Sequence, residues 1–456
     1  MSVYANVSKT KTWIRKNHLV WVILLAATLF LTRGLALDRY VSLDEVSWLR
    51  RSANFYYALG QRDFVQTRAS VDPAVTTMWV NTAAFLIDAP QYRGYGQGYF
   101  EDFSAFDNFV RSRDIDPHQV LVTARYLMLA ENIILLVAAF ILSIRLIGLV
   151  PAFAGFMLVA LDPFHIEWTT VSHTDGQLSC LMILAIVSFL YYFMVKPKAI
   201  YLLISAVTTS LALLTKLPGY LLFVFFAGFL VYEFFWKRRR ALPNHKKALN
   251  DWFRRSALHM GVWLATVIIV YVAVWPAMWV EPIQTFSRQI TAPFIFVDRE
   301  EMLSPSTDNS NTIEVILPEK VPGVFQRLLK YPAVVLWRST PVTLLGLVLF
   351  LVLIFRKSGF LREPGIREIA LIISIFIIIF LAFLSLAQMH NMRYMMPAVI
   401  LIDIIAALGW VSFIKTILSL NKLNLRLAAI AAVVILIAAL QGAAGRKAYP
   451  FCGWDH

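Results

Sequence analysis

Apolar runs of about 20 residues recur along most of the chain, and they constrain its fold more than any other feature. A helix of that length crosses the hydrocarbon core of a bilayer. Of the 456 residues, 59% are hydrophobic and only 15% are charged. A soluble protein of this size could not bury so much apolar side-chain surface. The sequence therefore predicts an all-α membrane protein that crosses the bilayer many times.

We predict about 11 transmembrane helices, which leave two long polar loops between them. The predicted spans are residues 19–37, 120–144, 149–163, 175–195, 199–214, 218–236, 257–278, 333–355, 367–387, 394–414 and 427–444. The polar loops cover residues 38–119 and 279–332. Because the spans 149–163 and 199–214 are short, helices between residues 149 and 236 could be tilted, broken or merged.

The segment 237–256 is a strongly basic loop between predicted spans, and it decides the orientation. It contains eight Lys and Arg residues and one acid, Asp251. Short loops rich in Lys and Arg stay in the cytoplasm. We therefore predict a cytoplasmic N-terminus, both long loops on the outer face and, with an odd number of spans, a C-terminus outside. The formal charge of +14 follows from the same excess of Lys and Arg. It is therefore not a sign of a nucleic-acid partner.

The chain ends soon after the last predicted span. We expect one membrane-embedded domain over residues 1–456, without a soluble C-terminal domain. Cys180 and Cys452 are too few for a disulfide framework, and no Cys/His spacing indicates a structural zinc site. No glycine-rich phosphate loop or Ser/His/Asp arrangement is present, which argues against an ATP-driven pump.

The first outer loop, 38–119, contains signals for two amphipathic helices. Ser42 followed by Glu45 forms a capping box, and Gly60 is a plausible helix end. Asp72 before Pro73 is typical of a second helix start, with an N-cap residue and then proline at the first helical position. The apolar face predicted for the first helix consists of Trp48, Leu49, Ser52, Ala53, Tyr56 and Tyr57. We expect both helices to lie at the membrane interface.

Asp44 and Glu45 open the first of these helices, just after the first span. Both acids favour the positive end of a helix, so capping alone would explain them. A helix N-terminus is also a rigid place to hold a carboxylate that takes a proton from an attacking hydroxyl group. The two interpretations are compatible, and both stay open at this point.

Three basic residues lie at the predicted outer ends of later spans. Arg125 begins the second span, Lys216 lies between the fifth and sixth, and Arg393 lies in a tight turn near the end of the chain. Each could be an interfacial anchor. Together they could instead form an outward-facing basic cluster that holds a lipid-linked phosphate.

Polar residues fill the segment 162–175, just before the fourth span. Ser172 and Asp175 could form another capping pair, with the two histidines as loop residues. The candidate site residues of this segment are His165, Glu167, His173 and Asp175. Such a group could also bind a divalent cation, but the spacing is generic and predicts no particular metal.

Taken in order, these motifs resemble the membrane glycosyltransferases of the GT-C fold, especially the protein O-mannosyltransferase and lipid A aminoarabinose transferase group, that is, glycosyltransferase family 39. The resemblance rests on the Asp-Glu pair of the first outer loop, the arginine at the head of the second span, a Thr-Asp at the start of a later span, Thr-Lys-x-Pro-Gly, and the turn Arg-Tyr-x-x-Pro from Arg393 to Pro397. It covers nearly the whole chain.

The resemblance implies transfer of a sugar, with inversion, from a polyprenyl-phosphate donor to an acceptor hydroxyl on the outer face of a bacterial plasma membrane. Asp44 would be the catalytic base and Glu45 would assist. The donor phosphate would be held by Arg125 and Lys216, with Arg393 nearby, and Asp175 would be the second acid. Related sequences have His-Pro-Gly-Val where this chain has Asp-Pro-Ala-Val from Asp72, which puts a metal or acceptor role there in doubt.

Two other classes of function compete with this interpretation. A transporter or flippase of a lipid-linked sugar would use the same basic cavity without chemistry, and should show an inverted repeat, which the sequence lacks. A non-catalytic scaffold would leave the ordered acids unexplained. The acceptor could be a protein, a lipid or a glycan, and the sequence does not identify the sugar.

Overall fold

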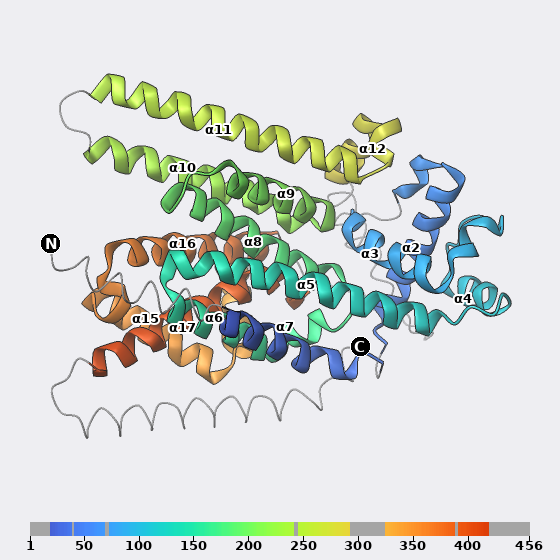
Figure 1. Cartoon of the computed structure of the whole chain (residues 1–456), viewed down its shortest axis with the longest axis horizontal. Coiled ribbons are helices and arrows are strands. Elements are labelled where there is room, and N and C mark those ends of the chain that lie inside the picture. Colours follow the sequence, from blue (N-terminus) through green and yellow to red (C-terminus); the bar gives the residue numbers. More distant parts are fainter. Residues whose placement is uncertain are drawn as a thin grey trace, which may run out of the picture.

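The computed structural model describes residues 19–38, 41–68, 73–240, 245–291, 324–387 and 391–418. Every regular element in these ranges is a helix, and most of the long ones run along the long axis of the molecule (Figure 1). The predicted all-α class is therefore confirmed. Seven described helices are long and apolar enough to cross a membrane, or eight if one bent pair is a single span.

Two further apolar helices, Leu19–Arg33 and Ala199–Thr215, fall short of that length. The predicted span 427–444 lies outside the described residues. A total of about 11 spans therefore stays a prediction.

The centre of the bundle is formed by α8 (Thr174–Met194) and α17 (Met396–Leu418). In the most apolar stretch of each, 89% of the residues are buried inside the protein, against 17% in the helix Ser256–Val274. Around them lie α5 (Pro117–Ile147), α6 (Leu149–Leu161), α9 (Ala199–Thr215), α15 (Pro341–Arg356) and α16 (Pro364–Leu386). The outer helices expose many leucine, isoleucine and phenylalanine side chains, as expected of surfaces that face lipid.

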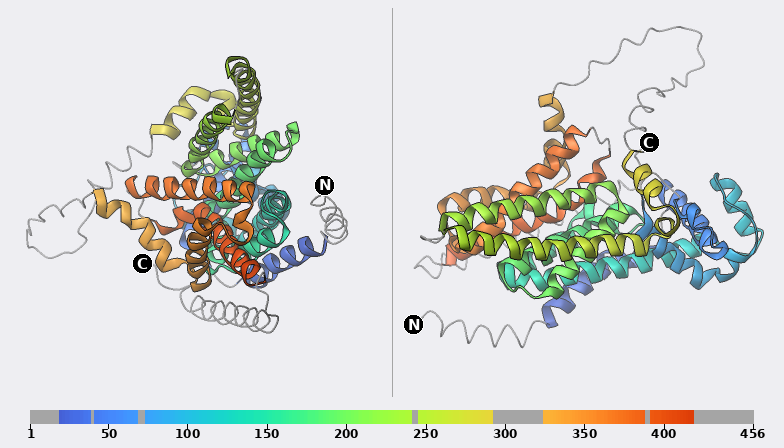
Figure 2. Two further views of the ribbon diagram at one scale, coloured as in Figure 1. Left: turned by 90° about the vertical axis from the view of Figure 1, so that its left-hand side faces the viewer. Right: turned by 90° about the horizontal axis from the view of Figure 1, so that it is seen from above.

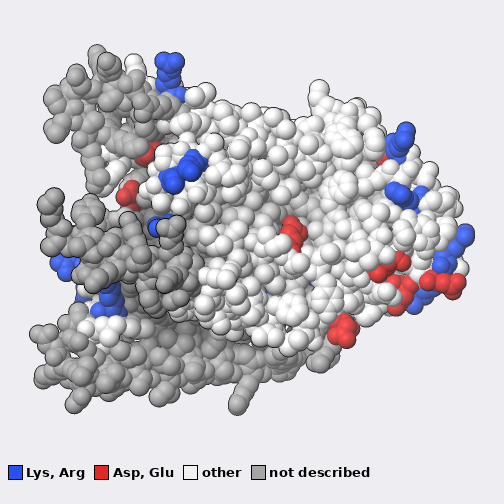
Figure 3. Space-filling view, viewed as in Figure 1, with Lys and Arg blue, Asp and Glu red and all other residues white. Residues whose placement is uncertain are grey.

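Charged side chains are concentrated at the two ends of the molecule. The space-filling view shows a broad belt between them that is almost free of Lys, Arg, Asp and Glu (Figure 3). Such a belt is what a bilayer requires, because an ionised group is costly in hydrocarbon. The structure is that of a multi-pass membrane protein.

The basic segment 237–256 is largely helical, contrary to the prediction of a loop. Helix α10 (Leu221–Arg240) continues through the four basic residues 237–240, and α11 (His245–Val274) begins well before the predicted seventh span. Lys and Arg are good helix formers, and their long side chains can leave the apolar zone while the helix continues. The prediction relied on residue polarity alone and therefore misplaced the ends of these two helices.

The short spans after α5 include a real break, as the sequence allowed. Helices α6 and α7 (Pro163–Thr169) meet at 65°. Asp162 ends the first helix and caps the second, since its Oδ1 accepts the backbone N–H of His165 at 2.8 Å. The buried Arg33 donates to the carbonyl oxygens of Val159 at 3.3 Å and Ala160 at 2.9 Å. Arg33 thus supplies hydrogen bonds to carbonyl groups in the last turn of α6, which have no partner within the helix.

The predicted span 333–355 is divided at residue 340. Helix α14 (Val324–Arg338) ends there, and α15 begins at Pro341 with Thr340 as its N-cap. The Thr340 hydroxyl accepts the backbone N–H of Thr343 at 3.2 Å. A proline after a threonine is a start signal that a hydropathy window does not register.

The first outer loop folds into a platform at one end of the bundle (Figures 1 and 2). It consists of α2 (Leu43–Gln61), α3 (Val75–Asp88) and α4 (Phe103–Arg111), with short turns Phe64–Thr67 and Pro90–Gly94. The face predicted for α2 is buried along its whole length, from Trp48 to Tyr57. It packs against protein, chiefly α3, so the capping box and the amphipathic pattern located this helix correctly.

The start of α3 differs from the prediction. Its first helical residue is Val75, and the N-cap residue is Ala74, which has a left-handed backbone with φ of 47°. Pro73 is therefore not the first helical residue, and Asp72 lies outside the described residues. The reason is a tertiary contact, because the Ala74 N–H donates to the Thr215 carbonyl at 3.1 Å. This contact joins the platform to the end of α9, next to Lys216.

Candidate functional site

Glu45 and Arg125 form a buried ion pair between α2 and α5. Arg125 donates through Nε at 2.7 Å and through Nη2 at 2.5 Å to the two oxygens of Glu45. Its Nη1 donates to the Leu37 carbonyl. The same carboxylate accepts the backbone N–H of Ser42 at 3.0 Å and of Ser172 at 2.8 Å. With side-chain exposures of 0% and 2%, this pair fastens the start of α2 to the bundle.

This geometry favours a structural role for both residues. All three guanidinium nitrogens of Arg125 face protein oxygens, which leaves none directed at a donor phosphate. Both oxygens of Glu45 are also engaged. Removing either charge would leave its partner buried and unpaired, which is costly. The two residues hold the start of α2 against α5.

Asp44, the neighbouring acid, is in a different environment. Its side chain is 43% exposed, and it pairs with Arg393, which comes from the far end of the chain. Nε2 of His173 lies 3.6 Å from the same carboxylate oxygen. The hydrogen bond with His173, together with the charge of Arg393, holds the pKa of Asp44 well below its usual range. Asp44 is therefore an ionised carboxylate with an open side, beside a guanidinium group.

Asp175 is the buried centre of the same network, at the start of α8. Lys216 donates to its two oxygens at 2.8 and 3.0 Å. Nε of Arg393 lies 3.3 Å and Nδ1 of His173 lies 3.1 Å from Oδ2. The N-cap of α8 is His173 and not the predicted Ser172, whose hydroxyl donates to Asn81 at 2.7 Å. The first turn of a helix favours a negative charge such as that of Asp175.

Aromatic rings surround these charges. The Arg393 guanidinium lies 5.2 Å from the centre of the Trp168 ring, and the Lys216 ammonium lies 4.2 Å from that of Tyr394. The edge of His173 meets Trp168, with ring centres 5.4 Å apart. Gly176 allows this arrangement, because a Cβ atom at that position would collide with the Trp168 carbonyl oxygen. Cation–π contacts of this kind favour positive charge in a partly dry site.

Five residues predicted from the sequence therefore meet in one charge network, which we call the Asp44 network: Asp44, His173, Asp175, Lys216 and Arg393. They come from α2, α8, the turn before α10 and the turn before α17. The two carboxylates and two permanent cations balance. His173 lies between the two acids.

Other predicted residues lie elsewhere. His165 is buried and faces Arg33, with 2.9 Å between its Nδ1 and Nη2 of the arginine. Glu167 is exposed on α7, and Asp72 is outside the described residues. Within the described ranges, no group of three or more His, Cys, Asp or Glu side chains is arranged to hold a metal ion.

Sequence reasoning missed Arg33 and Tyr331. Arg33 ends an apolar run and resembles an ordinary interfacial anchor, yet it is only 2% exposed. Tyr331 lies in α14, and its hydroxyl donates to the Asn391 carbonyl at 2.9 Å, two residues before Arg393. The position of Arg33 at the end of an apolar run is a sequence signal that could have been used. Nothing in the local sequence pointed to Tyr331.

Comparisons with known proteins agree with this architecture. No family model and no curated protein matches the chain. Among solved structures, ArnT from Cupriavidus metallidurans bound to undecaprenyl phosphate superposes with a TM-score of 0.53 at 16% identity. That alignment covers 92% of this chain and 63% of ArnT. The same enzyme in the apo state gives a TM-score of 0.51 at 16% identity, over 97% of this chain and 74% of ArnT.

The chain has a GT-C-like fold. This confirms the fold that the order of motifs suggested. The chain spans less than two thirds of the first ArnT structure, and at this level of identity the likeness concerns the fold alone.

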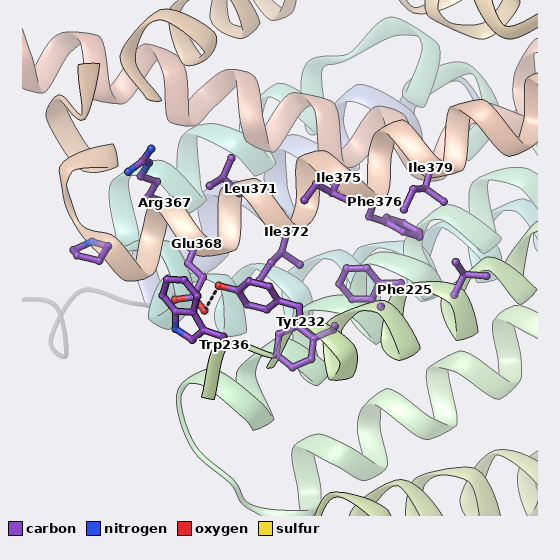
Figure 4. Close-up of a pocket in the computed structure, with 14 residues that line it drawn as sticks. Phe225, Tyr232, Trp236, Arg367, Glu368, Leu371, Ile372, Ile375, Phe376 and Ile379 are labelled. Atoms are coloured by element: carbon purple, nitrogen blue, oxygen red, sulfur yellow. Dashed lines mark hydrogen bonds between the residues drawn. The ribbon is translucent and has the colours of Figure 1, made fainter. Parts of the chain in front are cut away.

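Two apolar grooves run along the GT-C-like bundle. One, of about 550 Å³, lies between α10 and α16 and extends to the ends of these helices away from the Asp44 network. Tyr232 donates there to Glu368 at 3.0 Å, near Trp236 and Arg367 (Figure 4). The other, of about 560 Å³, is lined by α14, α15, α16 and α17. It begins beside Leu328 and Pro332 on α14, the helix of Tyr331, and so lies closer to the network.

Proposed function

We propose that this protein transfers a sugar from a polyprenyl-phosphate donor to an acceptor hydroxyl group at the outer face of a bacterial plasma membrane. The observation that carries the proposal is the Asp44 network, which places a half-exposed, ionised carboxylate next to Arg393, with Lys216 in the same network, at one end of a GT-C-like bundle. A lipid-linked sugar needs a cation for its phosphate and a base for the acceptor. Both lie in this network.

Arg393 is the proposed primary contact of the donor phosphate, with Lys216 behind it. The Arg393 side chain is 17% exposed, against 4% for Lys216 and 2% for Arg125. A guanidinium group can bind two phosphate oxygens at once. The ArnT structure bound to undecaprenyl phosphate supports a donor of this class. The groove between α14 and α17 is the proposed path of the polyprenyl chain.

Asp44 is the proposed general base. The acceptor hydroxyl would approach the open side of Asp44 and attack the anomeric carbon while the phosphate leaves towards Arg393 and Lys216. Attack opposite to the leaving group inverts the configuration at that carbon. Holding the two reactants in line lowers the barrier, because bound reactants have already lost the translational and rotational freedom that free molecules would lose in the transition state.

The experiment is transfer from purified polyprenyl-phosphate sugars by the protein in nanodiscs, measured as released polyprenyl phosphate and as glycosylated acceptor. The proposal predicts release that depends on the acceptor, and products of inverted configuration. Parallel reactions with EDTA measure whether a divalent cation contributes.

The same preparation distinguishes a flippase. Proteoliposomes loaded with fluorescent polyprenyl-phosphate sugar would report movement between leaflets without cleavage. Movement without release of polyprenyl phosphate, across the donors and acceptors tried, would replace the transferase by a transporter.

A further inference from the structure

Arg338, the last residue of α14, is a cation beside the Asp44 network. Its Nη2 lies 3.7 Å from Sδ of Met392, the residue before Arg393, and this contact is exposed. Its Nε is buried and has no hydrogen-bond acceptor among the described residues. A thioether sulfur is only a weak acceptor. Within the part of the chain that the structure describes, no acid therefore offsets the charge of Arg338.

Arg338 and Arg393 lie side by side along one face of α7. The guanidinium group of Arg338 is 5.8 Å from the centre of the Phe164 ring, and that of Arg393 is 5.2 Å from the centre of the Trp168 ring. Residues four apart on a helix are neighbours, so the two arginines occupy adjacent positions over these rings. A cation–π contact orients a guanidinium group without neutralising it.

Helix α14 connects Arg338 with the groove lined by α14, α15, α16 and α17. Val335 lines this groove and lies three residues before Arg338, so the two side chains share a face of α14. The Tyr331 hydroxyl, on the same helix, donates to the Asn391 carbonyl at 2.9 Å and so holds α14 against the turn that carries Arg393. An apolar groove that leads to an unpaired cation suits a lipid with a phosphate group at its end.

We propose that Arg338 binds the phosphate of the polyprenyl-phosphate donor together with Arg393. This inference rests on the proposed function and adds a second arginine to its phosphate site. Arg393 is paired with Asp44, and Lys216 is paired with Asp175, so acids already offset part of their attraction for an anion. Arg338 supplies the uncompensated positive charge, and its planar guanidinium group can donate to two phosphate oxygens at once.

A purely structural role for Arg338 makes a different prediction. A basic residue in the last turn of a helix stabilises the negative end of that helix, and an arginine at a membrane interface can extend its charged group into the polar zone. Either role would make the stability of the protein depend on Arg338 and leave the affinity for the donor unchanged. Binding and stability are therefore measured separately.

The test compares wild type, Arg338→Gln and Arg338→Lys for the Kd of polyprenyl phosphate and for the kcat and donor KM of transfer. Arg338→Gln should raise both Kd and KM by about 10- to 100-fold, the range expected for a lost hydrogen bond between charged groups. The kcat at saturating donor should not change, because the contact is made in the ground state and in the transition state alike. Arg338→Lys keeps the charge but not the planar fork, so it should lose less affinity than Arg338→Gln.

Two controls separate the phosphate contact from damage to the groove. The uncharged polyprenol should bind to wild type and to Arg338→Gln equally well, since it lacks the phosphate. An equal loss of polyprenol and polyprenyl phosphate binding would overturn the proposal. Arg113→Gln is the matched variant, because Arg113 is an exposed arginine on the platform that also lies over an aromatic ring, 4.7 Å from the centre of Tyr95. It should keep the wild-type Kd and KM.

Failure of this inference and failure of the proposed function give different results. An Arg338→Gln variant with a lower thermal midpoint but the wild-type Kd and KM would overturn the phosphate contact alone. Wild type that binds polyprenyl phosphate but transfers no sugar would overturn the proposed function. The Kd of Arg338→Gln would then still decide whether Arg338 binds the lipid phosphate.

Discussion

Asp44 and Glu45 are adjacent residues with the same carboxylic acid group, but their environments are opposite. Glu45 is fully buried and has four hydrogen-bond donors, whereas Asp44 is 43% exposed. The capping box predicted that Glu45 is the structural residue, because its side chain must turn back to the Ser42 backbone. Its pairing with Arg125 was not predictable, since it depends on how α2 lies against α5.

The Glu45–Arg125 pair should behave as one unit in stability measurements. Glu45→Gln or Arg125→Gln alone leaves a buried charge unpaired, so each should lower the free energy of unfolding by about 3–5 kcal/mol. The double variant should lose much less than the sum of the two. Thermal unfolding in detergent of all four proteins gives this coupling. Additive losses would show that the two side chains do not interact as described.

Ala74 carries backbone strain that glycine would remove. Its φ of 47° lies in the left-handed region, which costs an alanine about 1 kcal/mol. Ala74→Gly should therefore raise stability by up to about 1 kcal/mol, seen as a higher thermal midpoint. Ala83→Gly, within α3 itself, is the control and should lower stability by a similar amount. A lower thermal midpoint in both variants would mean that the backbone of Ala74 is not strained.

At the scale of helices, breaks were harder to predict than apolar runs. Spans such as α8 and α16 begin within a few residues of their predicted starts, because hydropathy marks them directly. The division of α14 from α15 and the bend after α6 arise from Thr340 and Asp162, which cap helices inside apolar stretches. Buried caps depend on neighbours distant in sequence, and a window average hides them.

The bend between α6 and α7 should depend on Arg33. Arg33→Gln removes a cation that donates to the carbonyls of Val159 and Ala160 and to Thr169. Hydrogen bonds from a charged donor are worth about 1.5–3 kcal/mol each, so we expect a loss of at least about 2 kcal/mol. Arg145→Gln, at an exposed arginine on α5, should change stability by less than about 0.5 kcal/mol. Equal thermal midpoints for the two variants would contradict this role.

For the molecule as a whole, the sequence predicted that the candidate site residues share one end of the bundle, and five of them meet in the Asp44 network. Helices of known length alternate in direction across the membrane, so residues at alternate span ends must share a side. The direction of the spans does not distinguish Arg125 from Arg393, because both residues lie at span ends. Only the packing shows that the Arg125 side chain is buried, at 2% exposed, whereas that of Arg393 is 17% exposed.

The proposed orientation can be tested by cysteine labelling in intact cells. Ser112→Cys, at the exposed end of α4, should react with a membrane-impermeant maleimide. Arg356→Cys, at the opposite end of the bundle, should react only after permeabilisation. The background carries Cys452→Ser, and Cys180 is buried. Labelling in the reverse order would place the Asp44 network on the cytoplasmic side.

The most direct test of the central claim is single-turnover sugar transfer by wild type, Asp44→Asn and Asp44→Glu, each saturated with a polyprenyl-phosphate sugar. A general base contributes about 10²- to 10⁴-fold to a rate, so Asp44→Asn should slow transfer by that factor and still bind the donor. Asp44→Glu, which keeps the carboxylate, should retain more activity than Asp44→Asn. Transfer by a folded Asp44→Asn at the wild-type rate would contradict the assignment of Asp44 as the base.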